Sequence, residues 1–236
     1  MLTDYEIASQ AKPAKIKNVA ARLGIEKEDL MPFGDEVTKV NLHALTRPRK
    51  RTEKAKLVLV SATTPTAAGE GKTTTSIGLA QALDRLGESV CLALREPSLG
   101  LCMGIKGGAT GGGYSQVVPA DRINLHFTGD FHAITTVNNL ISATVDNHIF
   151  QGNELGLDPR QIVWRRVMDM NDRSLRDIVI GLGGRMQGIP RQGGFDITAA
   201  SEIMAILCLA KDMDDLRTRL DSILIGTTWK GAPVYL

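Results

Sequence analysis

The sequence predicts an α/β fold with a mostly parallel sheet, helices on both faces and an N-terminal helical segment in front. Short apolar runs alternate with segments whose apolar residues recur at helical spacing. Strands that alternate with helices along a chain usually pair in parallel and are covered on both faces. In addition, a glycine-containing loop follows each of the first two apolar runs. Such loops are common where a parallel strand gives way to a helix.

The N-terminal helical segment is expected to span residues 1–55, and the sheet domain residues 56–236. In the first segment, Ile16, Val19, Ala20 and Leu23 share one helical face, and Gly24 ends that helix. The domain is expected to contain strands at residues 57–62, 89–94, 123–127, 162–167 and 223–226, and helices at residues 73–86, 130–148, 174–180 and 196–210.

Composition narrows the classes of function. The chain has 236 residues, of which 43% are hydrophobic and 23% charged, as in ordinary globular proteins. A net charge of only +2 provides no general attraction to nucleic acid or to a membrane surface. Aromatic residues make up 4% of the chain, too few for a surface on which bases stack. We therefore expect neither a nucleic-acid partner nor a membrane partner.

The cysteines indicate a reducing compartment. Cys91, Cys102 and Cys208 have no metal-ligand spacing, and their odd number in apolar contexts predicts buried, unpaired thiols. The first residues do not resemble a signal peptide, and no apolar stretch reaches membrane-spanning length. The expected location is the cytoplasm.

The strongest functional pattern is Gly69-Glu70-Gly71-Lys72-Thr73, which follows the apolar run at residues 57–62. In a loop of this kind, backbone N–H groups bind phosphate oxygens, and the lysine reaches the β- and γ-phosphates. The threonine hydroxyl ligates Mg²⁺, and the following helix adds its positive N-terminal end. The pattern predicts a P-loop NTPase-like domain that binds ATP and Mg²⁺, with Lys72 as a catalytic residue and Thr73 as the metal ligand.

The full P-loop pattern has a glycine where this chain has Thr66. A helix N-terminus with flexible glycines is the plain structural alternative. The apolar run before the loop and the helical periodicity after it favour the nucleotide site. The predicted nucleotide contacts are Thr66, Ala67, Ala68, Gly69, Glu70, Gly71, Lys72 and Thr73.

Arg95 and Glu96 follow the second predicted strand. Ligands of open α/β sheets bind at the carboxyl ends of the strands, where the phosphate loop is also expected. The planar guanidinium of Arg95 can donate two parallel hydrogen bonds to a carboxylate or a phosphate. The alternative is an Arg95–Glu96 surface pair without a role. We predict that Arg95 is catalytic and that Arg95 and Glu96 bind the substrate.

Six of the ten residues from 104 to 113 are glycine. Linkers are more often rich in polar residues and serine, whereas a loop of glycines lets the backbone approach a ligand. Lys106 supplies positive charge in this loop. We predict that Lys106 is a further substrate-binding residue.

The segment Gly-Ile-Lys-Gly-Gly-Ala-Thr-Gly-Gly-Gly-Tyr, residues 104–114, resembles the glycine-rich segment of the formate–tetrahydrofolate ligase family, which usually has alanine where this chain has Thr110. Further segments similar to that family are residues 65–73, 95–100, 124–134, 166–172 and 194–198. The likeness extends from about residue 4 to the end of the chain. It implies ATP-dependent formylation of tetrahydrofolate through formyl phosphate, with Lys72 and Thr73 at ATP and Arg95 at formate.

Two departures accompany the resemblance. The family usually has a tyrosine- and lysine-rich stretch near Phe33 and Gly34, and its chains are considerably longer than this one. The resemblance therefore implies an amino-terminal nucleotide-binding portion that lacks the family's C-terminal folate-binding region. The implied partners are formate and tetrahydrofolate, together with a homo-oligomer or a separate chain that supplies the rest.

Two other functions stay open. A P-loop ATPase switch of the partitioning or metallochaperone type would share the Gly-Lys-Thr core, but that class carries a lysine early in the loop, where this chain has Ala67 or Ala68. The chain could also serve as a binding or assembly module without complete catalytic machinery.

Overall fold

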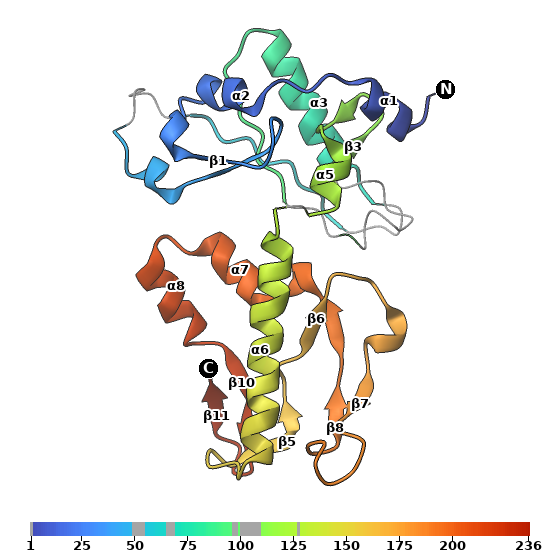
Figure 1. The fold of residues 1–236 in the computed structure, drawn as a ribbon, viewed down its shortest axis with the longest axis vertical. Coiled ribbons are helices and arrows are strands. Elements are labelled where there is room, and N and C mark those ends of the chain that lie inside the picture. The colour runs from blue at the N-terminus through green and yellow to red at the C-terminus, as the bar shows by residue number, and fades with distance from the viewer. Residues whose placement is uncertain (1, 49–54, 65–68, 96–98, 100–109, 127) are drawn as a thin grey trace. The chain divides into compact units, whose positions relative to one another are not determined.

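We describe the fold from a computed structural model in which residues 2–48, 55–64, 69–95, 99, 110–126 and 128–236 are described (Figure 1). The chain divides into two compact units, one up to Thr128 and one from Gly129 to Leu236. The predicted domain boundary at residue 55 stays a prediction. The mixture of helices and strands confirms the α/β class.

The first unit is built mainly from short elements. Its helices and strands are α1 (Asp4–Gln10), α2 (Ile16–Arg22), η1 (Lys27–Asp29), β1 (Leu30–Pro32), β2 (Thr38–Val40), η2 (Leu42–Leu45), α3 (Lys72–Arg85), β3 (Gly111–Gly112), β4 (Ser115–Gln116) and α5 (Ala120–Asn124). The antiparallel pairs β1–β2 and β3–β4 are its two sheets among the described residues. Among the described residues of this unit, the buried apolar ones are Ala20 and Ile77.

The second unit holds most of the core. It comprises α6 (Asp130–Phe150), β5 (Leu157–Ile162), β6 (Arg166–Met168), η3 (Arg173–Leu175), β7 (Ile178–Ile180), β8 (Arg191–Gly193), β9 (Phe195–Ile197), η4 (Thr198–Ala200), α7 (Glu202–Leu209), α8 (Met213–Leu220), β10 (Leu224–Thr228) and β11 (Pro233–Tyr235). The strands form the sheet β11–β10–β5 and the pairs β6–β9 and β7–β8.

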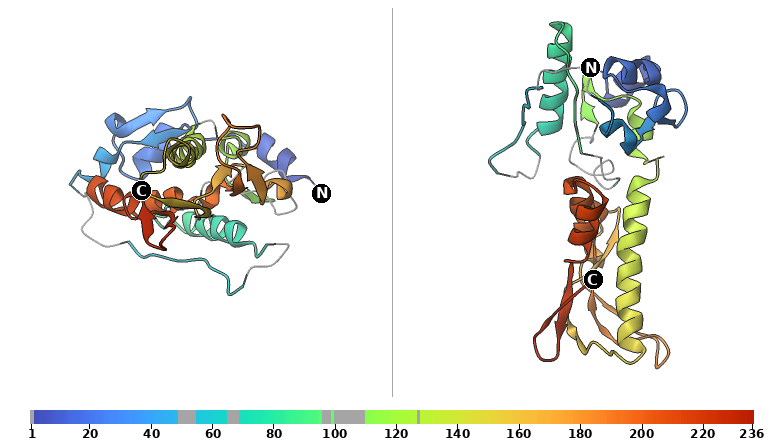
Figure 2. Two further views of the ribbon diagram at one scale, coloured as in Figure 1. Left: turned by 90° about the horizontal axis from the view of Figure 1, so that it is seen from below. Right: turned by 90° about the vertical axis from the view of Figure 1, so that its left-hand side faces the viewer.

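Helix α6 organises this core. Its buried residues include a row at intervals of three or four positions, which is the spacing of one helical face: Phe131, Ile134, Asn138, Ile141, Val145 and Ile149. Four of these residues, Ile134, Ile141, Val145 and Ile149, belong to one core cluster with residues in or beside the strands and in α7: Leu157, Trp164, Ile203, Ile206, Ile223 and Ile225. The two views of the ribbon agree that α6 runs alongside the strands of its unit (Figure 2).

The predicted helices at residues 73–86 and 130–148 are confirmed as α3 and α6. The predicted strand at residues 223–226 is confirmed as β10. The strand predicted at residues 162–167 is divided between β5 and β6, because the N–H groups of Val163 and Trp164 both donate to the Ile225 carbonyl, at 2.9 and 3.2 Å.

The mostly parallel sheet is a wrong prediction for the described residues. Only β6 and β9 pair in parallel there, and the other pairs are antiparallel. Residues 57–62 and 89–94 form no strand. Leu57 is 94% exposed and Leu59 is 83% exposed, so the apolar run that predicted a buried strand is not covered. Without a partner strand, the backbone of such a run has no ladder of hydrogen bonds to join.

Three further elements differ from the predictions. Residues 123–127 were expected as a strand, but α5 forms over Ala120–Asn124, with Pro119 at its N-cap and Asp121 in its first turn. Both residue types favour a helix start. Residues 174–180 were expected as a helix, but the β-branched run at 178–180 forms β7. The helix expected at residues 196–210 begins only at Glu202, because Phe195–Ile197 pairs with β6 as β9.

Candidate functional site

Helix α3 begins at Lys72, directly after two glycines in left-handed conformation. Gly69 has φ +84° and Gly71 has φ +68°, and a Cβ atom on either would meet no atom within 4 Å. The backbone conformation, rather than a lack of space, therefore favours glycine at both positions. No described side chain caps this helix, so its first N–H groups are not engaged by a capping oxygen. An uncapped helix N-terminus after left-handed glycines suits an anion.

The Lys72 ammonium forms an ion pair with the Glu70 carboxylate. The side chain of Lys72 is 46% exposed, whereas that of Glu70 is 18% exposed. Lys72 therefore remains open to solvent on part of its surface while Glu70 holds it at the start of α3. A phosphate that bound Lys72 would compete with Glu70 for the same ammonium.

Thr73 lies in the first turn of α3 and is half-buried. Among the described residues, its hydroxyl has no hydrogen-bond partner. The same part of the chain contains no group of three or more His, Cys, Asp or Glu side chains that could hold a metal ion. A Mg²⁺ ion that is bound mainly through phosphate oxygens and water needs few protein ligands, and a single hydroxyl can be one of them.

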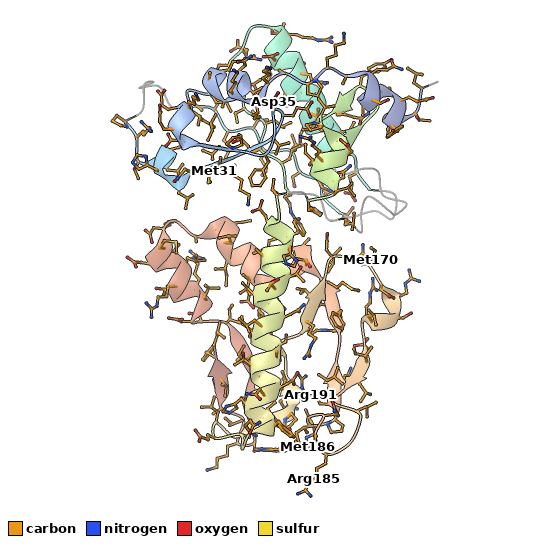
Figure 3. All side chains as sticks on the ribbon, in the orientation of Figure 1. Met31, Asp35, Met170, Arg185, Met186 and Arg191 are labelled. Atoms are coloured by element: carbon orange, nitrogen blue, oxygen red, sulfur yellow. The ribbon has the colours of Figure 1, made fainter. Side chains whose placement is uncertain are left out.

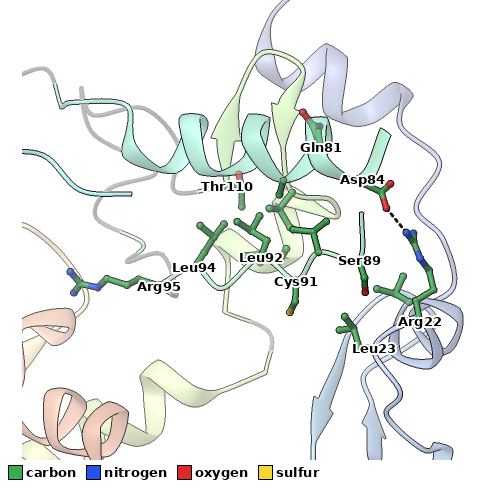
Figure 4. Close-up of a pocket in the computed structure, with 15 residues that line it drawn as sticks. Arg22, Leu23, Gln81, Asp84, Ser89, Cys91, Leu92, Leu94, Arg95 and Thr110 are labelled. Carbon is green, nitrogen blue, oxygen red and sulfur yellow. Dashed lines mark hydrogen bonds and ion pairs between the residues drawn. The ribbon is translucent and has the colours of Figure 1, made fainter. Parts of the chain in front are cut away.

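Arg95 borders a pocket in the first unit, with a volume of about 610 Å³. Most of the wall is apolar and comes from α2, α3, α5 and residues 89–95. Figure 4 shows Leu92 and Leu94 among the apolar side chains, with Arg95 extending away from them. Thr110 lies in the same wall and is only 4% exposed. The Arg22–Asp84 ion pair lies at the other end of the group (Figure 4).

The structure brings Arg95 and Thr110 to one pocket, but Lys72 and Thr73 are not in its lining. The pocket meets α3 at Ala80, Gln81 and Asp84. At 1.5 Å per residue, Gln81 lies roughly 13 Å along the helix axis from Lys72. Five of the predicted contacts lie outside the described residues: Thr66, Ala67, Ala68, Glu96 and Lys106.

A buried carboxylate in the first unit was not predicted. Asp29 is 2% exposed and accepts hydrogen bonds from Arg47 Nε at 2.6 Å and Arg47 Nη2 at 3.3 Å. His43 Nδ1 lies 3.5 Å from the same carboxylate. The Arg47 guanidinium is the main cause that holds the pKa of Asp29 below its ordinary value, with His43 contributing.

A second ionic group in the other unit was also missed. Asp146 on α6 accepts from Arg166 at 2.7 Å and from Arg191 at 2.8 Å. The Arg191 side chain is 4% exposed, and Figure 3 shows it beside α6. This group connects α6 to β6 and β8, so it has a structural part in the unit.

The prediction of buried thiols is wrong for two of the three cysteines. Cys91 and Cys208 are exposed, and Cys102 lies outside the described residues. Apolar neighbours in sequence predicted burial, but residues 89–94 lack the sheet that would cover them. In the described part of the chain, no helix is both long and apolar enough to cross a membrane.

The chain is similar to known proteins over nearly its whole length. A family model described as formate–tetrahydrofolate ligase matches residues 2–236. Three curated proteins named formate–tetrahydrofolate ligase are similar over 99% of this chain: 59% identical in Paenarthrobacter aurescens, 56% in Limosilactobacillus fermentum and 57% in Symbiobacterium thermophilum.

The names of these relatives describe one class of protein, ligases of formate and tetrahydrofolate. The chain belongs to the formate–tetrahydrofolate ligase family. It spans 42% of the length of each of the three relatives. The resemblance seen in the sequence alone is thereby confirmed for an amino-terminal portion.

Proposed function

We propose that this chain is the ATP- and formate-handling part of a formate–tetrahydrofolate ligase. The proposed reaction joins formate to N10 of tetrahydrofolate and yields 10-formyltetrahydrofolate, ADP and phosphate. The observation that carries the proposal is the start of α3: an uncapped helix begins at Lys72 after left-handed Gly69 and Gly71, in a chain of this family.

The nucleotide would bind at this helix start. The first N–H groups of α3 donate to phosphate oxygens, and the Lys72 ammonium leaves Glu70 to pair with the β- and γ-phosphates. Thr66, Ala67 and Ala68 are further proposed contacts of the triphosphate, together with Gly69, Glu70 and Gly71. The glycines fit this role because the loop turns through conformations that L side chains rarely adopt.

The Thr73 hydroxyl suits a Mg²⁺ ion bound to the phosphates, since it lies in the first turn of α3 and has no other partner among the described residues. When bound, Mg²⁺ would neutralise negative charge that develops on the phosphate oxygens. Thr73 would hold its position beside the triphosphate.

Formate is a poor electrophile because its carboxylate is stabilised by resonance. In the proposed first step, a formate oxygen attacks the γ-phosphorus, the bond to the β-phosphate oxygen breaks, and ADP leaves. In the second step, the N10 amine attacks the formyl carbon and phosphate departs with the bonding pair. The amine loses one proton to a base. Phosphoryl transfer depends mainly on positioning and charge stabilisation.

Arg95, Glu96 and Lys106 are the proposed groups at formate. The Arg95 guanidinium can orient the carboxylate through two parallel hydrogen bonds and then stabilise the acyl phosphate. Its place at the edge of a pocket leaves it open to a ligand. Lys106 would add positive charge. The proposed reaction requires Arg95 to approach the triphosphate at Lys72, because Lys72 is not in the lining of the pocket that Arg95 borders.

The family match favours the ligase over a partitioning-type ATPase. Formate and tetrahydrofolate are the proposed substrates, and the proposed protein partner is either a second copy of this chain or a separate chain that supplies the remaining region of the ligase. The exposed thiols of Cys91 and Cys208 suit a reducing compartment, so the cytoplasm is the proposed location.

A conservative change at Arg95 tests the proposed reaction in a full-length ligase that carries this chain. Arg95→Lys keeps the charge but removes the bidentate fork. We expect unchanged ATP affinity and a loss of formate-dependent ADP formation of about a hundredfold, the scale of one lost stabilising contact in a transition state. Coupled assay of ADP against formate concentration measures this effect.

Arg85→Lys is the matched control, because Arg85 is an exposed arginine at the end of α3 with no ion pair among the described residues. Unchanged turnover in Arg95→Lys would show that Arg95 has no part in formate activation.

A further inference from the structure

A small hairpin ends the glycine-rich stretch of the sequence. Strands β3 and β4 pair antiparallel around the turn Gly113–Tyr114, with Gly112 opposite Ser115. The Val117 N–H donates to the Thr110 carbonyl at 2.9 Å and closes the base of the hairpin. A two-stranded hairpin of this length is not stable by itself, so its position depends on the elements around it.

One of these elements is α3. Gln81 Nε2 donates to the Tyr114 carbonyl at 2.9 Å. A Cβ atom on Gly111 would lie 2.0 Å from the Ser115 carbonyl oxygen and 2.7 Å from Ile77 Cδ1. Glycine at position 111 therefore permits the close approach of the two strands and the buried Ile77.

The other element is α1, which is more than a hundred residues away in sequence. Asp4 Oδ1 accepts a hydrogen bond from the Gly113 N–H at 2.7 Å. Gln116 Nε2 donates to the Asp4 carbonyl at 2.9 Å and to the Gly113 carbonyl at 2.7 Å. Thr3 and Glu6 form a capping box that fixes the first turn of α1, and with it the direction of Asp4.

The base of this hairpin, Thr110, lines the same pocket as Arg95. We propose that Asp4 is a positioning residue for formate: it ties the hairpin, which Gln81 contacts from α3, to α1 and thereby fixes the wall of the pocket that Arg95 borders. This inference rests on the proposed function. Asp4 itself touches no substrate in this account, and the nucleotide contacts at Lys72 do not depend on it.

Amide hydrogen exchange tests the structural part, whatever the activity of the chain. In Asp4→Ala, exchange at Gly113 should accelerate about fivefold to tenfold, as expected for one lost hydrogen bond. Asp4→Asn should restore slow exchange because its amide oxygen also accepts. Gln116→Met removes hydrogen bonds to the Asp4 and Gly113 carbonyls from the hairpin side and leaves every side chain of α1 and its capping box in place, so it tests the contact without a substitution in that helix.

Steady-state kinetics in the full-length ligase test the functional part. Asp4→Ala and Gln116→Met should raise the KM for formate about fivefold, with the KM for ATP and kcat within twofold. Asp4→Asn should resemble the wild type. Glu88→Ala is the control, since Glu88 is an exposed carboxylate of the same unit whose side chain has no partner among the described residues.

Unchanged exchange at Gly113 in Asp4→Ala would overturn the inference. So would faster exchange with an unchanged KM for formate, or equal losses in the KM for both substrates. A wild-type ligase that forms ADP without formate would instead refute the proposed function, and the exchange result would then decide whether Asp4 holds the hairpin.

Discussion

The Lys72–Glu70 ion pair keeps the Lys72 ammonium in place at the start of α3. Glu70 is the less exposed partner and lies two residues earlier, so it can hold the ammonium beside the start of α3. An exposed pair of this kind contributes little to stability. In the proposed function, a triphosphate would replace this one carboxylate as the partner of the Lys72 ammonium.

Asp29 differs from Glu70, because its carboxylate is almost fully buried and is paired with Arg47. Arg47 is the main cause of its lowered pKa. A carboxyl whose pKa is lowered on folding stabilises the fold above its unfolded pKa, about 3.9. That contribution is lost as the pH falls through the lower pKa of the folded state.

Replacing Arg47 by Met should therefore make the stability of the protein less sensitive to acid. The free energy of unfolding of Arg47→Met should be below that of the wild type at pH 7, and the gap between the two should be smaller at pH 3, because the contribution of Asp29 falls as the pH approaches the lowered pKa of the folded state. Urea titrations at both pH values measure this difference. Arg85→Met affects no paired carboxylate, so its free energy of unfolding should differ from that of the wild type by the same amount at both pH values. A constant gap for Arg47→Met would contradict this account.

At the scale of elements, a buried charge joins three parts of the second unit. Asp146 on α6 meets Arg166 of β6 and the buried Arg191 of β8. Removing the carboxylate would leave the Arg191 guanidinium buried without its partner. The cost of an unpaired buried charge exceeds the net benefit of the pair itself.

Asp146→Ala should lower the free energy of unfolding by about 3 kcal/mol. The double variant Asp146→Ala/Arg191→Met should be more stable than Asp146→Ala, because it removes the unpaired charge and fills the space with an apolar side chain. Urea unfolding of the wild type and both variants provides the comparison. If the double variant is less stable than Asp146→Ala, the unpaired charge of Arg191 is not the cause of the stability that Asp146→Ala loses.

The two long helices that were predicted correctly are determined by local pattern. Helices α3 and α6 are long enough for their periodic apolar residues to identify one face. The strands at residues 57–62 and 89–94 failed because strand formation requires a partner elsewhere in the chain. An apolar run indicates burial, but it does not supply that partner. Thus Leu57 is exposed although its neighbours in sequence are apolar.

For the residues of the candidate site too, those in a local pattern could be predicted and contacts between distant residues could not. Gly69, Gly71 and Lys72 could be recognised because their spacing alone defines a turn into a helix. The contact of Asp4 with Gly113 could not, since 109 positions separate them and an exposed aspartate carries no sequence signal of its partner. For the same reason, the pairing of Asp29 with Arg47 appears only in the folded chain.

At the scale of the whole molecule, the chain matches its family over residues 2–236 but spans 42% of the length of three relatives. A folate pocket needs a mostly apolar cleft with a few directed polar groups. After residue 200, the aromatic side chains are Trp229 and Tyr235, which are 60% and 53% exposed. They do not form an enclosed pterin pocket.

The 236-residue polypeptide alone should therefore form no measurable 10-formyltetrahydrofolate from formate, ATP and tetrahydrofolate. The amount of product is measured by its absorbance after conversion in acid. A full-length family member is the positive control. Robust synthesis by the purified polypeptide without a copurifying chain would mean that the folate site lies within these residues.

The central claim is that Lys72 at the start of α3 binds the phosphates of ATP. Isothermal titration calorimetry of MgATP into the 236-residue chain tests it most directly. The wild type should bind, and Lys72→Ala should lose about 1.5–3 kcal/mol of binding free energy, the range for a charge-assisted contact. Lys17→Ala, which removes an exposed lysine without a partner among the described residues, should bind as the wild type does. Equal affinity of the wild type and Lys72→Ala would contradict the claim.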